Sequence, residues 1–205
     1  MLVLVDYKAG NLTSVKLAFS ALGVEAIVTS DPSVVRFADR VVFPGVGAAA
    51  SAMGNLHSLG LEAALKEVAA KGVPFLGICL GTQILFEESE EDGGTKVLGI
   101  LPGRVPRFRP SSSRDKVPEI GWNQVVQVGS HPLFEGIPDS SEFYFVHSFY
   151  PAPADDSIVI GRTTYADVTF ASAVAKGNVA ATQFHPEKSG RVGLKLLSNF
   201  LSWNP

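Results

Sequence analysis

One cysteine stands between two glycines, where an apolar run gives way to residues compatible with a helix. The segment 77–81 reads Gly-Ile-Cys-Leu-Gly, at the end of the run Val73–Cys79 and before the run Gln83–Glu87. This spacing is typical of a nucleophile elbow, a tight strand-to-helix turn that projects its central side chain from the top of a sheet. The flanking glycines let the backbone turn without a Cβ clash, and the start of a helix favours the thiolate. We therefore expect Cys79 to be a nucleophile; the alternative is a small buried residue in a glycine-rich turn.

A histidine and a carboxylate lie two positions apart near the end of the sequence. The segment 183–190 reads Gln-Phe-His-Pro-Glu-Lys-Ser-Gly. In an extended chain, residues two apart point to the same side, and Pro186 favours an extended conformation at His185. Glu187 can then fix the tautomer of His185 and stabilise its imidazolium form. A surface turn would explain this tripeptide alone, but with Cys79 it completes the nucleophile, base and orienting group of a thiol hydrolase.

A glycine-containing loop follows another expected strand. Residues 44–47 read Pro-Gly-Val-Gly, and the carboxyl ends of parallel strands meet at one edge of a sheet, where ligands bind. An oxyanion hole needs the N–H after the nucleophile, here that of Leu80, and a second donor from a neighbouring loop. The segment Gly45–Gly47 can supply that donor. Two alternatives stay open: a dinucleotide fingerprint, because 45–50 fits Gly-x-Gly-x-x-Ala, and an ordinary glycine-rich loop.

Strands that end at one edge of a sheet must position these residues. The first ~85 residues show the alternation of strands and helices that builds such a sheet. Apolar runs indicate strands, and apolar residues at helical spacing, closed by glycine, indicate helices. The expected strands are Met1–Asp6, Val24–Thr29, Arg40–Phe43 and Val73–Cys79, and the expected helices begin near Leu12 and Leu61. The alternation predicts parallel βαβ units with right-handed crossovers.

The second half of the sequence is richer in short β runs separated by glycine and proline. The expected strands are Val125–Val128, Glu142–Val146, Ile158–Thr164, Val168–Ala175 and Asn178–Thr182. A hairpin turn is expected at 175–178, and a final helix carries Val192, Leu196 and Phe200 on one face. No linker separates the halves. We expect residues 1–205 to form one α/β domain, with a central, mostly parallel sheet flanked by helices and an antiparallel extension.

Composition and charge exclude several classes of protein. The 205 residues are 46% hydrophobic and 18% charged, with a net charge of −3, as in a globular protein that binds neither nucleic acid nor membranes through bulk charge. The single cysteine excludes an internal disulfide and a multi-cysteine zinc site. No apolar run is long enough to span a bilayer, and the N-terminus lacks the basic region of a signal peptide. We expect a cytoplasmic protein.

The other histidines are weaker catalytic candidates. His57 lies in a loop-like stretch, His131 precedes a proline in an expected turn, and His147 ends an expected strand. With Ser148, His147 would line a pocket through its backbone. Because the histidines show no paired spacing, we expect no metal site, and we expect no cofactor.

Two segments are interpreted as solvent-exposed. Glu87–Asp92 holds five acidic residues in six positions, which is typical of a frayed helix end. Pro110–Pro118, with three serines, is typical of an exposed loop. We expect neither segment to carry chemistry.

Taken together, these motifs resemble the class I (triad-type) glutamine amidotransferases, through 77–81 and the distant His-Pro-Glu. Within that family the chain is similar to the glutaminase subunits of imidazole glycerol phosphate synthases. The similar segments are 44–47, 121–124 (Gly-Trp-Asn-Gln), 145–148 (Phe-Val-His-Ser) and 183–190, and the resemblance runs from Val5 to Leu201.

The resemblance implies a glutaminase with a protein partner. Cys79 would attack the side-chain amide of glutamine, His185 would pass a proton to the departing ammonia, and Glu187 would orient His185. The residues expected to bind glutamine are Gly47, Gln83, Ser148 and Phe149. The ammonia would pass to a (β/α)8-barrel cyclase subunit in a heterodimer of histidine biosynthesis, which makes imidazole glycerol phosphate and aminoimidazole carboxamide ribotide. The expected partner interface consists of Asn11, Trp122, Tyr144 and Lys188.

The resemblance also implies that the Pro-Gly-Val-Gly segment must reorient to complete the oxyanion hole. Our hypothesis is that the Val46 carbonyl first occupies the place of a donor, and that partner binding flips the peptide to present the N–H of Gly47. Two positions depart from the family: Phe149 stands where tyrosine is frequent, and Glu119 stands where histidine is common. We expect no catalytic role for Glu119.

Two other functions are weighed against this one. The chain could be the glutaminase of another synthase, such as the pyridoxal phosphate system, but the loop of that system typically has a Gly-Gly-x-Ser pattern. It could also be a non-catalytic sensor or binding module with a reactive Cys79. His185 and Glu187 argue against a sensor, because a sensor needs no proton donor for a leaving amine. A nucleotide-binding protein would need an acidic ribose contact, and no convincing one is present.

Overall fold

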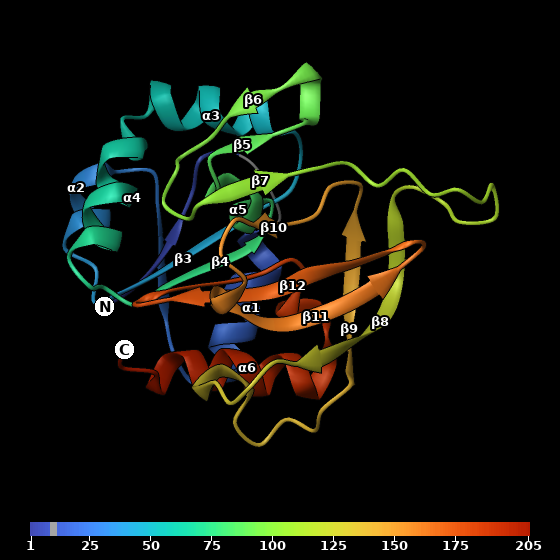
Figure 1. Cartoon of the computed structure of the whole chain (residues 1–205). Helices are drawn as coiled ribbons and strands as arrows, with labels where there is room; N and C mark the ends of the chain where they lie inside the picture. Colours follow the sequence, from blue (N-terminus) through green and yellow to red (C-terminus); the bar gives the residue numbers. More distant parts are fainter. Residues whose placement is uncertain (9–11) are drawn as a thin grey trace.

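One large sheet runs through the molecule, and the computed structural model describes residues 1–8 and 12–205 (Figure 1). Among these residues it has nine strands in the order β2-β1-β3-β4-β13-β12-β11-β8-β9. The parallel half consists of β2 (Ala26–Thr29), β1 (Leu2–Val5), β3 (Arg40–Gly45), β4 (Phe75–Cys79) and β13 (Val179–Thr182). The antiparallel half consists of β12 (Val168–Lys176), β11 (Val159–Tyr165), β8 (Glu119–Gln127) and β9 (Ser141–His147). The expected α/β fold is confirmed.

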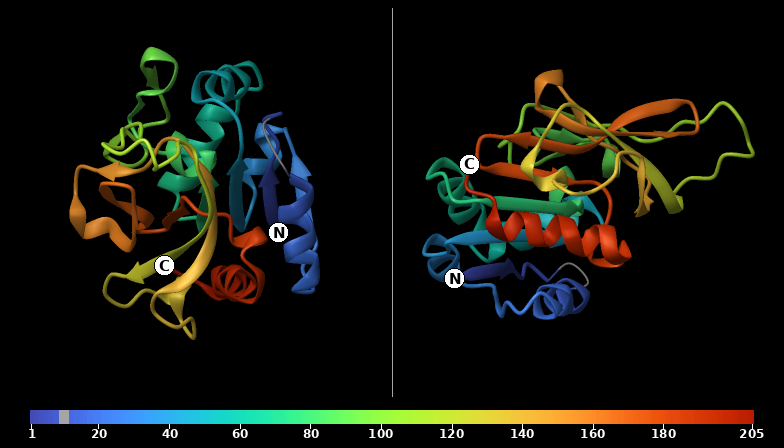
Figure 2. Two further views of the ribbon diagram at one scale, coloured as in Figure 1. Left: turned by 90° about the vertical axis from the view of Figure 1, so that its right-hand side faces the viewer. Right: turned by 90° about the horizontal axis from the view of Figure 1, so that it is seen from below.

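Helices cover both faces of the parallel half (Figure 2). One face carries α1 (Leu12–Ala21) and α6 (Gly190–Ser202), and the other carries α2 (Pro32–Arg36), α3 (Ala49–Ser58), α4 (Leu61–Ala70) and α5 (Leu80–Ile84). Alternate residues of β1 enter the two cores: Val3 and Val5 lie under α2–α5, and Leu2 and Leu4 lie under α1 and α6. Burial on both faces explains the continuous apolar run of β1.

A second, smaller sheet contains part of the acidic segment. Its order is β10-β7-β5-β6, with β10 (Ala152–Pro153), β7 (Gly103–Val105), β5 (Glu88–Ser89) and β6 (Thr95–Lys96). The interpretation of Glu87–Asp92 as a frayed helix end is therefore wrong. Its carboxylates bind backbone amides instead: Glu87 accepts from the N–H of Gly103 at 2.8 Å, and Glu90 accepts from the N–H of Arg107 at 3.0 Å.

Two helices have no counterpart in the expected pattern. The short helix α2 begins after Asp31, whose carboxylate accepts a hydrogen bond from the N–H of Ser33 at 2.8 Å, a standard N-cap. The helix α3 contains His57, which the sequence assigns wrongly to a loop. Gly54 and the small residues of α3 weaken its helical pattern. The elbow helix α5 also differs, because it starts at Leu80 and ends before 85–87.

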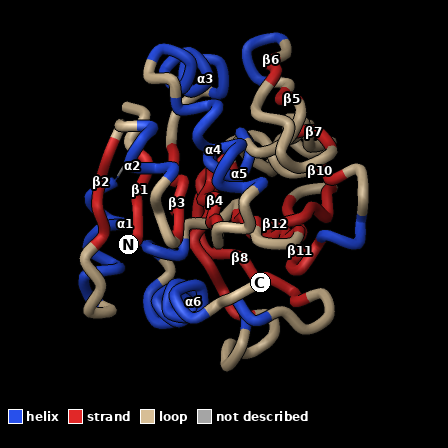
Figure 3. Tube along the Cα trace, turned by 90° about the vertical axis from the view of Figure 1, so that its left-hand side faces the viewer, coloured by secondary structure: helices blue, strands red, loops and turns tan. Residues whose placement is uncertain are grey.

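The remaining elements are short and lie in the second half of the chain or beside β5. They are the 3₁₀ turns η1 (Glu91–Gly93), η2 (Pro132–Phe134), η3 (Asp156–Ile158) and η4 (Pro186–Lys188). In Figure 3 the helices α3 and α6 lie on opposite sides of the strands β1, β3 and β4. Pro110–Pro118 forms no helix or strand, as expected. Within the described ranges, no helix is long and apolar enough to cross a membrane.

Candidate active site

The turn between β4 and α5 is a nucleophile elbow. Cys79 ends β4 with φ 54° and ψ −110°, a left-handed conformation that strains a residue with a Cβ. The sharp turn is thus made by the cysteine itself and not by its flanking glycines. Gly81 has another role, because a Cβ there would lie 1.8 Å from the carbonyl oxygen of Phe43. Glycine at this position lets α5 pack directly on β3.

His185 and Glu187 lie on either side of the start of η4, directly after β13. Nδ1 of His185 lies 2.8 Å from Oε1 of Glu187, and both side chains are at most 3% exposed. The backbone also holds the histidine, because its N–H donates to the carbonyl of Tyr144 at 2.9 Å. The expected orienting carboxylate is in place.

The other ring nitrogen of His185 faces the elbow. Nε2 is buried without a hydrogen-bond partner of ordinary geometry among the described residues. Burial of the ring opposes its charged form, but the Cys79 thiol and the Glu187 carboxylate outweigh this effect and raise the pKa of His185 to about 10. At neutral pH the imidazole therefore carries a proton, which suits a group that protonates a leaving amine.

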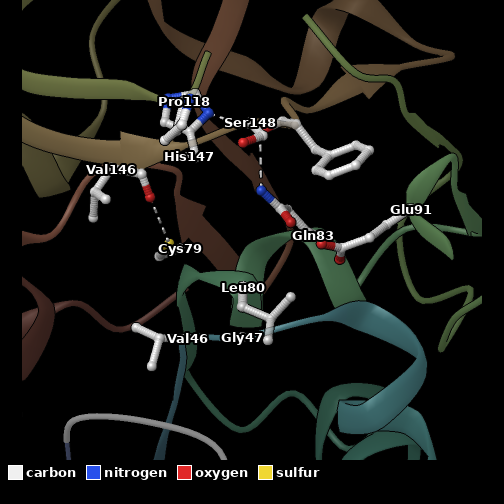
Figure 4. Close-up of a pocket in the computed structure, with 11 residues that line it drawn as sticks. Val46, Gly47, Cys79, Leu80, Gln83, Glu91, Pro118, Val146, His147 and Ser148 are labelled. Atoms are coloured by element: carbon white, nitrogen blue, oxygen red, sulfur yellow. Dashed lines mark hydrogen bonds between the residues drawn. The ribbon is translucent and has the colours of Figure 1, made fainter.

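The thiol lies at one end of a cavity of about 280 Å³ (Figure 4). Its lining combines the elbow, the loop after β3, the acidic segment and the end of β9. The lining residues are Val46, Gly47, Cys79, Leu80, Gln83, Glu91, Pro118, Val146, His147, Ser148 and Phe149.

The structure thus brings together the residues assigned from the sequence to the oxyanion hole and to glutamine binding. Gly47 has φ 111°, a conformation open to glycine and unfavourable for other residues. Gln83 donates from Nε2 to the carbonyl of Phe149 at 3.0 Å and to Oε1 of Gln183 at 2.9 Å. Because both amide hydrogens are used, Oε1 of Gln83 remains an acceptor with a set orientation.

Two contacts of the thiol have no signal in the sequence patterns. The amide of Gln183 donates to Sγ of Cys79 at 3.7 Å, and Sγ lies 3.9 Å from the carbonyl oxygen of Val146 (Figure 4). Gln183 belongs to the segment that contains the histidine, but its role as a bridge between Gln83 and the thiol depends on the pairing of β13 with β4.

Glu91 is a pocket residue that the sequence analysis missed. Glu91 lines the cavity, whereas the acidic pattern of Glu87–Asp92 predicts a solvent-exposed segment. Its carboxylate accepts from the N–H of Ala49 at 2.7 Å. Burial raises the pKa of Glu91, against the effect of that hydrogen bond. The acidic run Glu87–Asp92 is typical of a solvent-exposed segment, so its pattern does not indicate that Glu91 faces the cavity.

The residues expected at a partner interface lie beside His185. Trp122 of β8 is 55% exposed and packs edge-on against Tyr144 of β9, with ring centroids 6.1 Å apart. Nζ of Lys188 lies 5.8 Å from the centroid of the Tyr144 ring. Asn11, the fourth of these residues, lies outside the described part of the chain.

The structure places Glu119 beside His147. It is buried and lies 3.0 Å from His147, with Oε2 facing Nε2. His147, expected to contribute only its backbone, lines the cavity.

Comparison with known proteins agrees with this geometry. The family model described as glutamine amidotransferase class-I matches residues 3–203. The chain belongs to this family. A relative of this amidotransferase from Dehalococcoides mccartyi (strain CBDB1), "Imidazole glycerol phosphate synthase subunit HisH", is 53% identical over 98% of the chain and 96% of the relative. A protein of the same name from Nitrosococcus oceani is 52% identical over 98% of the chain and 96% of the relative.

Solved structures share the fold of this amidotransferase. One described as a glutamine amidotransferase has a TM-score of 0.75 at 22% identity and covers 98% of this chain and 97% of its own. The glutaminase domain of Trypanosoma brucei CTPS with bound acivicin has a TM-score of 0.65 at 15% identity, covering 100% and 96%. At these identities the likeness concerns the fold alone.

Proposed function

We propose that this amidotransferase is the glutaminase subunit of an imidazole glycerol phosphate synthase in histidine biosynthesis. It hydrolyses glutamine to glutamate and ammonia. The observation that carries the hydrolysis is the strained Cys79 elbow facing a protonated His185 that Glu187 holds at 2.8 Å. The name shared by relatives at about half identity over nearly the full chain supports the choice of synthase.

Each half-reaction uses the same two side chains. The Cys79 thiolate attacks the amide carbon of glutamine, and the imidazolium of His185 gives its proton to the departing nitrogen, which leaves as ammonia. The resulting γ-glutamyl thioester is attacked by water, whose proton passes to the now neutral His185. Collapse of this second intermediate expels the thiolate and releases glutamate.

The oxyanion formed in each step needs donors beside Cys79. We assign them to the N–H groups of Leu80 and Gly47, which line the same cavity. Gly47 has a positive φ, which supports the hypothesis that the Val46–Gly47 peptide rotates between two orientations. In this assignment the Val46–Gly47 peptide presents its N–H only when the partner is bound.

Glutamine would occupy the cavity with its amide at Cys79 and its amino-acid end toward Gln83 and Glu91. The Oε1 atom of Gln83 has no hydrogen to donate and can accept from the α-ammonium group. The carboxylate of Glu91 adds charge complementarity on the same wall. Ser148 and Phe149 close the cavity from the β9 side.

Ammonia would leave toward a partner subunit that covers Trp122, Tyr144 and Lys188. These side chains contact one another, and the carbonyl of Tyr144 binds the N–H of His185. A partner seated there would cover the mouth nearest the histidine. We propose that this partner is a (β/α)8-barrel cyclase that forms a heterodimer with the chain.

The test is glutamate release from glutamine, measured with and without the cyclase subunit and its nucleotide ligand. We expect strong stimulation by the complex and loss of at least 10³-fold in Cys79→Ala, by analogy with the removal of other covalent nucleophiles. Hydrolysis without any dependence on the partner would support the glutaminase activity but contradict the assignment to this synthase. No hydrolysis under any condition would favour the sensor or binding module.

A further inference from the structure

A second carboxylate–imidazole pair is buried at the wall of the pocket, which His147 lines. Glu119 on β8 and His147 on β9 are direct partners in the strand register. Oε2 of Glu119 lies 3.0 Å from Nε2 of His147, and both side chains are at most 3% exposed. Neither of these two atoms has another hydrogen-bond partner among the described residues. The mechanism above makes no use of this pair.

The surroundings of the pair are aromatic. The ring centroid of His147 lies 5.3 Å from those of Phe108 and Phe170 and 5.6 Å from that of Phe145. Ionisable groups in apolar surroundings cost folding free energy unless each polar atom is satisfied. Replacing a buried ion pair by apolar residues of similar volume is often neutral or stabilising, so burial of the pair is weak evidence for a role in stability.

The hydrogen bonds of His147 determine where its protons lie. Nδ1 is 2.7 Å from the carbonyl oxygen of Phe149, which can only accept, so Nδ1 carries a hydrogen. Nε2 of the same ring faces Oε2 of Glu119 at 3.0 Å, so the carboxylate fixes the side of the ring opposite to the Phe149 carbonyl. The other oxygen of Glu119, Oε1, accepts from the side-chain amide of Asn123 at 2.8 Å, which sets the carboxylate orientation.

The carbonyl of Phe149 links this pair to the substrate wall. It accepts one hydrogen bond from Nδ1 of His147 and another, of 3.0 Å, from Nε2 of Gln83. Gln83 in turn binds Gln183, whose amide reaches the thiol of Cys79. The orientation of the Gln83 amide therefore depends on a carbonyl that His147 holds in place.

We propose that Glu119 and His147 are a positioning pair for substrate binding. Glu119 fixes the orientation of the His147 ring, Nδ1 of His147 holds the Phe149 carbonyl, and this carbonyl turns Oε1 of Gln83 toward the substrate. The proposal rests on glutamine as the substrate. It places no group of the pair on the reacting atoms, and it assigns a role to Glu119, where the family commonly has histidine.

The test compares two replacements of Glu119 in the complex with the cyclase subunit. Glu119→Leu removes the partner of Nε2, and we expect the KM for glutamine to rise about tenfold or more while kcat changes less than threefold, as expected when a buried hydrogen-bond partner is lost. Glu119→Gln can donate an amide hydrogen to Nε2 and keeps the Nδ1 hydrogen, so its KM is expected within threefold of wild type. Glu142→Leu, at an exposed position of the same hairpin, is the matched control.

Two readouts separate positioning from a general structural defect. Alkylation of Cys79 by iodoacetamide reports on the nucleophile without substrate, and its rate is expected to stay within twofold in every Glu119 variant. Nitrogen-15 NMR of the histidine rings in the wild-type protein is expected to show a hydrogen on Nδ1 of His147, and this measurement needs no variant to fold.

The proposal is overturned by an unchanged KM in a folded Glu119→Leu protein, by a loss in kcat alone, or by a Gln variant as impaired as the Leu variant. An unprotonated Nδ1 in His147 overturns it as well. Failure of the proposed function has a different signature, because the wild-type complex would then release no glutamate at all.

Discussion

The proton on His185 is held by two neighbouring groups, the sulfur of Cys79 and the carboxylate of Glu187. Burial alone would favour the neutral imidazole, yet Cys79 and Glu187 raise its pKa to about 10. A group whose pKa is raised on folding stabilises the fold fully below its ordinary value near 6.5, and that contribution is lost as the pH rises through about 10. In the proposed mechanism the same proton passes to the departing nitrogen, so the reaction and the stability of the fold depend on the same titration.

This titration predicts the alkaline limb of the pH profile. In the wild-type complex, kcat/KM for glutamine is expected to fall as the pH rises through about 10, where His185 loses its proton. Glu187→Gln removes one of the groups that raise this pKa, so the fall is expected at lower pH, with a lower rate at the plateau. The check is a pH–rate series for both proteins, with exposed Glu142→Gln as control. Superimposable limbs would contradict the assigned role of Glu187.

At this scale the sequence is a good guide where the signal is local. Cys79, His185 and Glu187 are predicted correctly as neighbours in one site, because each lies in a short motif whose geometry is set by adjacent residues. Glu91 and Glu119 are missed, since their roles come from burial against distant segments. The acidic run around Glu91 and the sequence around Glu119 do not indicate which carboxylate is directed toward the protein interior.

At the level of the elements, the peptide-flip hypothesis requires the loop between β3 and α3 to change its backbone conformation. At Gly47 an added Cβ would meet nothing within 4 Å, so the obstacle to a side chain is the φ of 111° and not a clash. Strain of this kind costs about 1–3 kcal/mol. The energy difference between two orientations of the Val46–Gly47 peptide is therefore sensitive to this single residue.

Gly47→Ala is expected to lower the partner-stimulated glutaminase rate about tenfold or more, since about 1.4 kcal/mol corresponds to one factor of ten. Gly54→Ala in α3 is the matched control, because a Cβ there also meets nothing within 4 Å and its φ is not positive. That control is expected to keep its activity and to gain helix stability. Steady-state rates with and without the partner decide the matter, and an unchanged stimulation in Gly47→Ala would exclude the peptide-flip hypothesis.

Element by element, the expected strands agree with the structure within a few residues, apart from β8. Their apolar runs reflect burial on both faces, a strong signal. The short helix α2 and the helix α3 were missed because α2 is brief and α3 is built from small residues, and the strand β8 begins six residues before the expected Val125. Its outward face carries Ile120 and Trp122, so its N-terminal half does not show the alternation expected for a strand covered by its own chain.

For the molecule as a whole, that outward face is the surface on which the proposed partner interface depends. Trp122 is 55% exposed and is supported from beneath by Tyr144. Large aromatic side chains at the centre of an interface typically contribute 2 kcal/mol or more to binding.

Trp122→Ala is therefore expected to weaken binding of the cyclase subunit by about 30-fold, the equivalent of roughly 2 kcal/mol, with no loss of fold. Val126→Ala, 48% exposed on the same strand and four residues farther along, serves as control and is expected to bind normally. Titration calorimetry of each variant with the partner gives the comparison. Equal affinities of the two variants for the partner would indicate that the interface does not include Trp122.

The order of the strands is the part of the fold that the sequence patterns do not predict. The segment β13 is nearly last along the chain, yet it inserts between β4 and β12 and joins the two halves of the sheet. The pairing aligns Thr182 with Ile78 and so brings the segment after β13 to the elbow. Local periodicity carries no information about such a long-range choice of neighbours.

The late position of β13 has a consequence for the protein during its synthesis. A nascent chain that has left the ribosome only as far as β12 already contains Cys79, but it lacks the strand and the histidine that act on it. In such a chain the parallel and antiparallel halves have no shared strand, and the thiol has no proton donor beside it. In the proposed mechanism, a chain of this length therefore lacks the group that would give a proton to the departing nitrogen.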